Sequence, residues 1–252
     1  MARLIPTQEI SSIEYTSERV VAEALVQTLD DEWMIYHSYP WLAARDGGAG
    51  ALRIGEADFV LYHRKWGLLV VEVKGGTVEF DRETQTWMQS SRPMKKSPFV
   101  QARLNMFRII DKIRDDTAIG RLPGTLPCSY GYAVILPHCR TAGSLPPGGD
   151  TSILLDAEAL ADLGPQLQKA LRRWAGSRPP TPLTSDQHKD MRKGLLSSFR
   201  IVPALSTVLD SEAATLARLT DEQAEALEGL YENDRVLVEG VAGSGKTLLA
   251  VN

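Results

Sequence analysis

Two acidic residues and one lysine lie in two neighbouring apolar segments of this 252-residue chain. Glu72 and Lys74 are two positions apart in the run 69–74, so in a β-strand both side chains lie on one face. Burying these charges costs free energy unless they are paired or bind a metal ion. Asp58 begins the preceding strand-like segment, 57–63, and hairpin pairing would bring its carboxylate next to Glu72. Two converging carboxylates repel each other unless a cation lies between them, and Mg²⁺ prefers oxygen ligands.

These three side chains predict hydrolysis of a phosphodiester bond in nucleic acid. A Mg²⁺ or Mn²⁺ ion held by Asp58 and Glu72 would polarise the phosphodiester and lower the pKa of its bound water. Lys74 would orient or deprotonate the attacking water. The alternative is an ordinary Glu72–Lys74 ion pair on a partly exposed edge strand, without any catalytic role.

Two predicted helices can add side chains to this site. Residues 14–30 have apolar positions at helical spacing, and Glu18 shares a face with Val21 and Leu25, which directs it toward the sheet. A second helix over 98–115 is expected to bury Val100, Leu104, Phe107 and Ile110. The opposite stripe of that helix would then present its polar residues to a phosphate backbone, namely Gln101, Asn105, Arg108 and Lys112.

The order of these residues resembles the nuclease-related (NERD) domain of the PD-(D/E)xK nuclease superfamily, over roughly residues 10–140. The matching pattern is Glu18 on a helix, Asp58 on a strand, Glu72 and Lys74 on the next strand, and Gln101 on the following helix. The resemblance implies an αβββαβ core of restriction-endonuclease type that hydrolyses nucleic acid with Mg²⁺. It implies metal binding by Asp58 and Glu72, and catalytic roles for Lys74, Glu18 and Gln101. One position departs from the family, because Ser17 stands where the family's helix often has glycine.

A second motif lies near the end of the sequence. Residues 240–247 fit the pattern G-x-x-x-x-G-K-[ST], between a strand-like run at 235–239 and a helical segment. Such a loop binds ATP with Mg²⁺, because backbone N–H groups converge on the phosphates and the lysine reaches the β- and γ-phosphates. The alternative is a glycine-rich turn that binds nothing. The expected nucleotide-binding residues are Gly240, Gly243, Ser244, Gly245, Lys246 and Thr247.

Gln223 precedes this loop, at the start of an acidic helix predicted over 221–232. The arrangement resembles the Q-motif of superfamily 1 helicases of the UvrD/Rep type, whose glutamine recognises adenine, over residues 215–252. The other helicase motifs are absent from the sequence, so we expect no ATPase or helicase activity from these residues alone. We therefore expect the chain to be a fragment of a longer nuclease–helicase protein.

The wider pattern of elements is typical of an α/β protein. We expect a hairpin at 77–88, a strand at 130–136 and a third helix at 157–174, followed by a Pro- and Ser-rich stretch at 177–185. These elements predict three parts along the chain. They are a nuclease domain over 1–160, a basic helical connector over 161–205, and the start of a P-loop NTPase domain over 206–252.

Composition and charge favour a soluble protein that binds a polyanion. The net charge is −4, but residues 92–121 contain eight basic and three acidic residues. No apolar run is long enough for a transmembrane helix, the N-terminus lacks a secretory signal, and the two cysteines do not form a CxxC motif. We therefore expect a cytoplasmic protein that binds nucleic acid, preferentially DNA, and ATP, and that does not bind membranes.

Two other functions fit the same sequence. The first is a catalytically inactive nucleic-acid-binding module that serves as a platform for a helicase or ATPase. The second is a P-loop ATPase of another lineage, whose N-terminal domain recognises proteins and has no affinity for nucleic acid.

Overall fold

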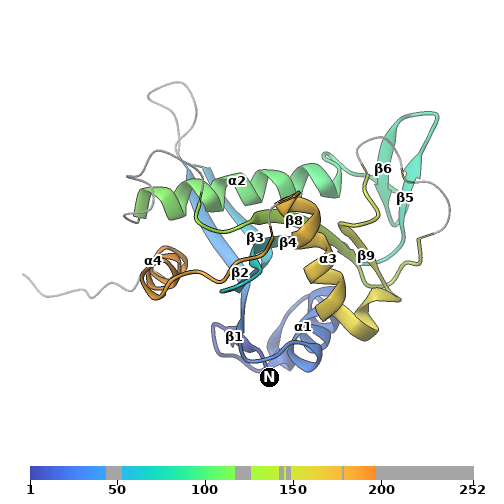
Figure 1. The fold of residues 1–252 in the computed structure, drawn as a ribbon. Helices are drawn as coiled ribbons and strands as arrows, with labels where there is room; N and C mark the ends of the chain where they lie inside the picture. The colour runs from blue at the N-terminus through green and yellow to red at the C-terminus, as the bar shows by residue number, and fades with distance from the viewer. Residues whose placement is uncertain (44–52, 117–125, 142–144, 146–148, 178, 197–252) are drawn as a thin grey trace, which may run out of the picture. The chain divides into compact units, whose positions relative to one another are not determined.

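The computed structural model describes residues 1–43, 53–116, 126–141, 145, 149–177 and 179–196. Met1–Ser197 form one compact unit, whose elements are labelled in Figure 1. The residues predicted to bind ATP, Gln223 and 240–247, lie outside the described residues.

A six-stranded mixed sheet organises this unit, in the order β1-β2-β3-β4-β8-β9. The strands are β1 (Arg3–Ile5), β2 (Trp33–Ala43), β3 (Arg53–His63), β4 (Gly67–Val73), β8 (Tyr130–Leu136) and β9 (Leu154–Asp156). Strands β2, β3 and β4 pair antiparallel in succession, whereas β1, β8 and β9 each join the sheet by parallel pairing. The parallel pairing of β4 with β8 requires a crossover, and helix α2 (Pro98–Asp116) lies within this connection.

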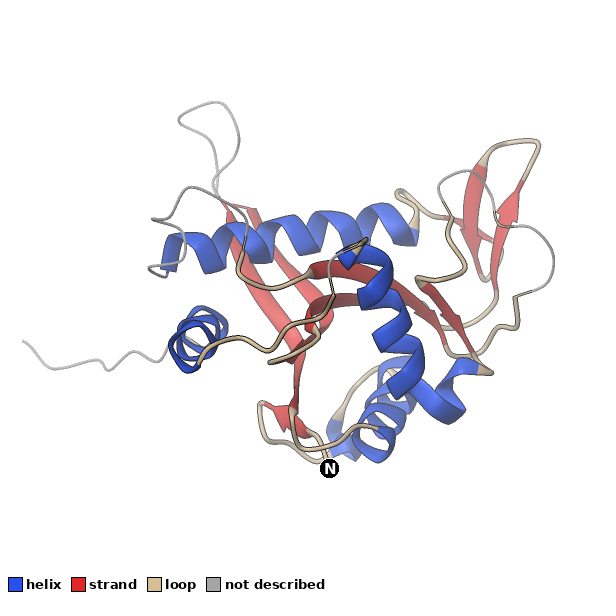
Figure 2. Cartoon of the chain, viewed as in Figure 1, coloured by secondary structure: helices blue, strands red, loops and turns tan. Residues whose placement is uncertain are grey.

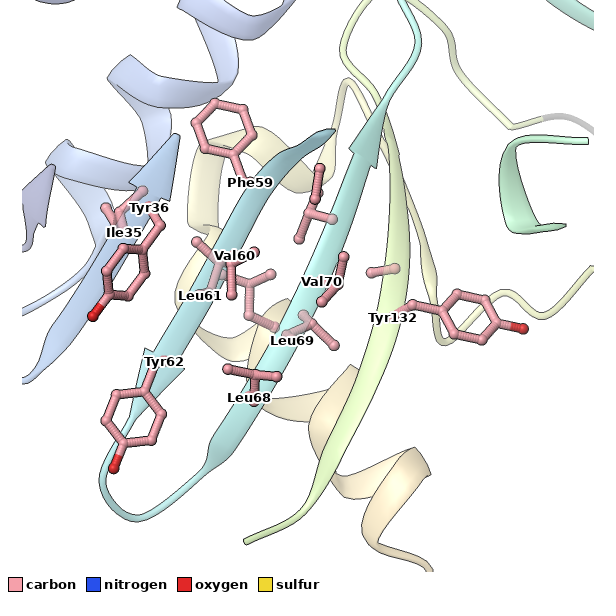
Figure 3. Packing of buried hydrophobic residues seen from close by; sticks show 14 of the residues in the cluster. Ile35, Tyr36, Phe59, Val60, Leu61, Tyr62, Leu68, Leu69, Val70 and Tyr132 are labelled. Carbon is pink, nitrogen blue, oxygen red and sulfur yellow. The ribbon is translucent and has the colours of Figure 1, made fainter. Parts of the chain in front are cut away.

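Strand β4 lies inside the sheet, and every residue in it is buried. Its sequence is a continuous apolar run except for Glu72, as expected for a strand that is covered on both faces. Figure 3 shows Leu68, Leu69 and Val70 of β4 beside Val60 of β3 in the hydrophobic core. Glu72 is therefore a carboxyl group placed in the most apolar part of the fold.

Helices cover the sheet on both faces (Figure 2). Helix α2 lies along one face and contacts β4 and β8, whereas α1 (Thr16–Thr28) and α3 (Leu163–Ala175) pack against each other on the other face. Helix α4 (Ser185–Leu195) packs against α2 and begins with a capping box formed by Thr184 and Gln187. The order α1-β2-β3-β4-α2-β8 is the αβββαβ order that we expected. None of the helices in the described ranges is long and apolar enough to cross a membrane.

A small three-stranded antiparallel sheet is inserted between β4 and α2. It consists of β5 (Val78–Asp81), β6 (Thr86–Gln89) and β7 (Arg92–Pro93). The sequence predicted the first two strands as a hairpin over 77–88. The ring of Trp87 in β6 lies 5.7 Å from that of Phe99 in the first turn of α2, so the small sheet is anchored to this helix.

Helix α2 lies where we predicted it, but two of the four expected core residues are wrong. Leu104 and Phe107 are 38% and 49% exposed, whereas Ile110 is buried as predicted and Val100 is half-buried. The buried residues of this helix are Pro98, Phe99, Ala102, Asn105, Met106, Ile109, Ile110 and Ile113. Because apolar residues occur on two adjacent stripes, their spacing is compatible with two faces that differ by one residue, or about 100° of rotation. The predicted polar stripe is therefore also wrong at Asn105.

Residues 161–196, which we expected to act as a connector, contribute α3 and α4 to the first unit. Leu167 and Leu171 of α3 are buried, as are Met191 and Leu195 of α4. Burying such side chains is favourable by about 1.5–3 kcal/mol each, so these helices pack on the unit rather than extend from it.

Candidate functional site

Strands β3 and β4 separate at Asp58. Their pairing ends at Phe59 and Val71, and the same register would set Asp58 opposite Glu72. The Asp58 carboxylate accepts a hydrogen bond of 2.6 Å from the backbone N–H of Val73. Because a buried backbone N–H needs an acceptor, Asp58 replaces the missing carbonyl of the neighbouring strand. We expected Asp58 at the beginning of its strand, but it lies inside β3, at the point of separation.

Strand β2 is distorted at the same level. Ser38 has a φ of 50°, in the left-handed region that is unfavourable for residues with a side chain. The pairing of β2 with β3 includes His37 and Tyr39 but skips Ser38, which the register sets opposite Asp58. The backbone ladder is therefore interrupted on both sides of Asp58.

Glu72 is fully buried, and the protein pairs both of its carboxylate oxygens. Oε1 lies 2.5 Å from Nζ of Lys74, and Oε2 accepts a hydrogen bond of 3.2 Å from Nδ2 of Asn105. Lys74 is partly exposed, so it connects the buried carboxylate to the surface. Lys74 follows the last residue of β4, and its contact with Glu72 places the two charged side chains together, as predicted. The ion pair of the alternative interpretation is present, but its expected position on an edge strand is wrong, because β4 lies between β3 and β8.

Asn105 of α2 holds the second oxygen of Glu72 in place. Its Nδ2 also donates to the backbone carbonyl of Glu56 at 3.1 Å, and its Oδ1 accepts from Nε1 of Trp41 at 3.1 Å. These contacts fix the orientation of the amide, because its oxygen and its nitrogen each have a partner. Gln101 lies one turn earlier and is half-buried, and its side chain makes no hydrogen bond within the part of the chain that the structure describes.

The surroundings of Asp58 and Glu72 disfavour two negative charges. Burial raises the pKa of Asp58 to about 6, although the Val73 N–H and the Lys74 ammonium group favour its charged form. Burial and then the charge of Asp58 raise the pKa of Glu72 to about 7, against the attraction of Lys74. Both carboxyl groups therefore keep their protons to a higher pH than exposed carboxyl groups do, and a bound divalent cation would favour the fully ionised form.

Glu18 approaches the same end of β4 from helix α1. Ser17 lies against Gly75, since a Cβ atom at Gly75 would be 2.8 Å from both Cβ and Oγ of Ser17. The charge of Glu18 contributes to the raised pKa values of Asp58 and Glu72, so the three carboxyl groups form one electrostatic cluster. Glu18 faces the sheet, as we expected, because its Oε2 lies 2.8 Å from Nε2 of His37 in β2.

Two residues of this cluster were not predicted from the sequence. His37 had no predicted role, because the strand that contains this histidine was not predicted. Asn105 was predicted on an exposed stripe, because the predicted helix phase was shifted. The only available signal for Asn105 was its position one turn after Gln101, within the helix that follows the Glu72–Lys74 strand.

The site offers a cation two carboxylates rather than a closed cage. Within the described ranges, no group of three or more His, Cys, Asp or Glu side chains is arranged to hold a metal ion. Mg²⁺ often uses only one or two protein carboxylates and keeps several water molecules, whereas structural zinc needs four protein ligands. Carboxylates such as those of Asp58 and Glu72 are ligands of the kind that Mg²⁺ accepts, whereas the described residues do not provide the four ligands of a structural zinc ion.

Comparison with known families identifies the region that contains this site. The family model of the nuclease-related domain matches residues 13–128, a span that includes Glu18, Asp58, Glu72, Lys74 and Asn105. No curated protein and no solved structure matched the chain. Residues 13–128 thus match a nuclease-related domain, and this match indicates a nuclease-related function and nucleic acid as the class of partner.

Proposed function

We propose that the nuclease-related domain at residues 13–128 hydrolyses phosphodiester bonds in nucleic acid, preferentially in DNA, with Mg²⁺ or Mn²⁺. One observation carries this proposal. Asp58, Glu72 and Lys74 meet where β3 and β4 separate, with Lys74 only 2.5 Å from the Glu72 carboxylate. Two carboxyl groups that can bind a metal ion, with a lysine ammonium group beside them, are suited to metal-assisted hydrolysis of a phosphodiester bond.

Each side chain has a distinct part in this proposal. Asp58 and Glu72 would hold the cation, which when bound polarises the phosphodiester and acidifies its water ligand. The ammonium group of Lys74 orients the attacking water and stabilises negative charge that develops on the phosphate. Glu18 adds a third carboxylate beside the pair, and Asn105 keeps Glu72 in one orientation. For Gln101, a contact with the phosphate backbone remains the proposed role.

The second candidate is a module that binds nucleic acid without cutting it. It is favoured by the pairing of both Glu72 oxygens with Lys74 and Asn105, because a carboxylate satisfied by the protein gains less from a cation. In this case the basic residues would bind the phosphate backbone, and the domain would serve as a platform for a motor.

Cleavage assays with purified protein separate these candidates. Supercoiled plasmid and single-stranded DNA and RNA are incubated with Mg²⁺, Mn²⁺ or EDTA, using the native chain and the variants Asp58→Asn and Lys74→Ala. We expect cleavage that requires a divalent cation and falls at least 100-fold in both variants, whereas the exposed variant Glu79→Gln cleaves normally. Cleavage that survives both substitutions would point to another site or a contaminating nuclease.

Binding in the absence of cleavage would select the platform instead. A titration of DNA binding against salt concentration tests this, because affinity that depends on phosphate contacts falls steeply with salt. A chain without any affinity for nucleic acid would contradict both candidates. That result would favour a domain that recognises proteins.

We also propose that residues 240–247 bind the phosphates of ATP with Mg²⁺ and that Gln223 recognises its adenine, as part of a helicase-like motor. The sequence pattern alone supports this proposal. The residues that would bind the nucleotide are Gly240, Gly243, Ser244, Gly245, Lys246 and Thr247. Binding of a fluorescent ATP analogue should be lost in Lys246→Ala, and equal binding by this variant would contradict the proposal.

A further inference from the structure

His37 is a buried histidine that contacts the carboxylate cluster and has no part in the proposed mechanism. It lies in β2 and is 8% exposed. Its ring centroid is 5.1 Å from that of Phe59, the residue that follows Asp58. A polar ring in such an apolar position requires hydrogen-bond partners, and His37 has one for each ring nitrogen.

The two partners determine which nitrogen carries the proton. Nδ1 of His37 lies 2.9 Å from Nε2 of Gln8, and an amide nitrogen can only donate a hydrogen bond. With the Gln8 amide in this orientation, Nδ1 is the acceptor and carries no proton. Nε2 then carries the proton of the neutral ring and donates it to Oε2 of Glu18, 2.8 Å away. The chain of hydrogen bonds runs in one direction, from Gln8 through His37 to Glu18.

These hydrogen bonds fix one carboxylate oxygen of Glu18 and leave the other oxygen available. The carboxylate is 14% exposed, and Oε2 is engaged by His37. Its Oε1 has no hydrogen-bond partner among the residues that the structure describes. Because the charge of Glu18 acts on both Asp58 and Glu72, the free oxygen belongs to a carboxylate that is already within electrostatic reach of the pair.

We infer that His37 is a positioning residue: held by Gln8 in its Nε2–H form, it orients the Glu18 carboxylate toward Asp58 and Glu72. The inference rests on the proposed nuclease function. It adds Gln8, which lies in the N-terminal segment before α1, to the residues that support the site. Groups that orient a functional carboxylate from behind typically change activity 10- to 100-fold when they are removed.

The same strand pair supplies a matched control. His63 in β3 is also buried, and its Nε2 lies 3.1 Å from a carboxylate oxygen of Glu32. Glu32 is 71% exposed, and His63 lies five residues beyond Asp58, about 17 Å along the strand. The change His63→Phe therefore removes a buried histidine that contacts a glutamate at the far end of β3, where that glutamate is exposed and far from Asp58.

The test combines single and double variants with steady-state kinetics. We expect His37→Phe to lower kcat 10- to 100-fold with little change in KM, and His37→Gln, whose amide can still donate to Glu18, to recover much of this loss. In a Glu18→Gln background, His37→Phe should have no further effect. His63→Phe should lower stability but leave kcat unchanged. Equal losses of kcat from His37→Phe with and without Glu18 would overturn the inference.

A second readout does not depend on cleavage. Long-range proton–nitrogen NMR of the imidazole rings reports the tautomer directly, and we expect the proton of His37 on Nε2. In Gln8→Leu, the Nδ1–H form should become populated, and the carboxyl carbon signal of Glu18 should shift. A native chain with the proton on Nδ1 would overturn the inference. If the native chain cuts no nucleic acid, the proposed function fails, while this measurement still decides the orientation of Glu18.

Discussion

Replacing Glu72 by glutamine should change how the stability of the fold depends on pH. Burial raises the pKa of Glu72 from 4.5 to about 7, a difference that corresponds to about 3 kcal/mol. Because the folded state binds the proton more tightly than the unfolded state, this stability is fully present below pH 4.5. It is lost as the pH rises through about 7. Between pH 5 and pH 8, the native chain should thus lose about 2–3 kcal/mol that Glu72→Gln does not lose.

Urea denaturation at pH 5 and pH 8 without divalent cations measures this difference. Any constant cost of the variant, such as an altered contact with Asn105, is the same at both pH values and cancels. His63 and His188, whose pKa values burial lowers, act in the opposite direction but are present in both proteins. The exposed variant Glu79→Gln should behave as the native chain does. The reasoning would be refuted if the native chain and Glu72→Gln lost the same stability between pH 5 and pH 8.

Three further substitutions test the packing and hydrogen bonds around the site, all by urea denaturation. Asp58→Ala should cost about 1–3 kcal/mol more than Asp58→Asn, because only asparagine retains an acceptor for the buried N–H of Val73; equal costs would contradict this role. Gly75→Ala should cost about 1–3 kcal/mol, since its methyl group meets Ser17 at 2.8 Å, and a neutral effect would show that α1 moves freely. Tyr62→Phe should cost about 1 kcal/mol, because it removes the hydrogen bond of 2.9 Å between the Tyr62 hydroxyl and the imidazole of His188 in α4. An unchanged urea midpoint would show that this hydrogen bond does not stabilise the fold.

The strand part of the site was predictable because the side-chain period of a strand is two. This period places Glu72 and Lys74 on one face, and the sequence separation from Asp58 suits a hairpin. The separation of β3 from β4 was not predictable. It depends on an Asp58 carboxylate that takes the place of a backbone carbonyl, and nothing in the local pattern of residues distinguishes this from ordinary pairing.

Strand β2 was not predicted from the sequence, and this has a specific physical reason. Its sequence contains Pro40, which normally argues against an interior strand, and the left-handed Ser38 interrupts its alternation. Proline is tolerated here because, among the residues that the structure describes, β1 pairs with Met34–Tyr36 alone and β2 is an edge strand beyond that point. Without this strand, the partner of Glu18 could not be found from sequence.

The wrong face of α2 has a different origin. Phe107 was expected in the core, but it lines a surface hollow together with Met106, Tyr130 and Trp174. An aromatic residue at such a hollow has the same spacing as a core residue, so periodicity does not separate the two. The phase is set by tertiary contacts, which include the hydrogen bonds of the Asn105 amide with Glu72 and Trp41.

Ser17 and Gly75 occupy one shared volume at the end of β4, so the two positions should vary together. A side chain fits at one of them only while the other is small, because the Cβ of Ser17 already fills the space beside Gly75. We expect homologues with glycine at position 17 to tolerate alanine at position 75, and Ser17→Gly to rescue Gly75→Ala. The sizes of these two residues then set how closely the helix that carries Glu18 can approach the strand that carries Glu72.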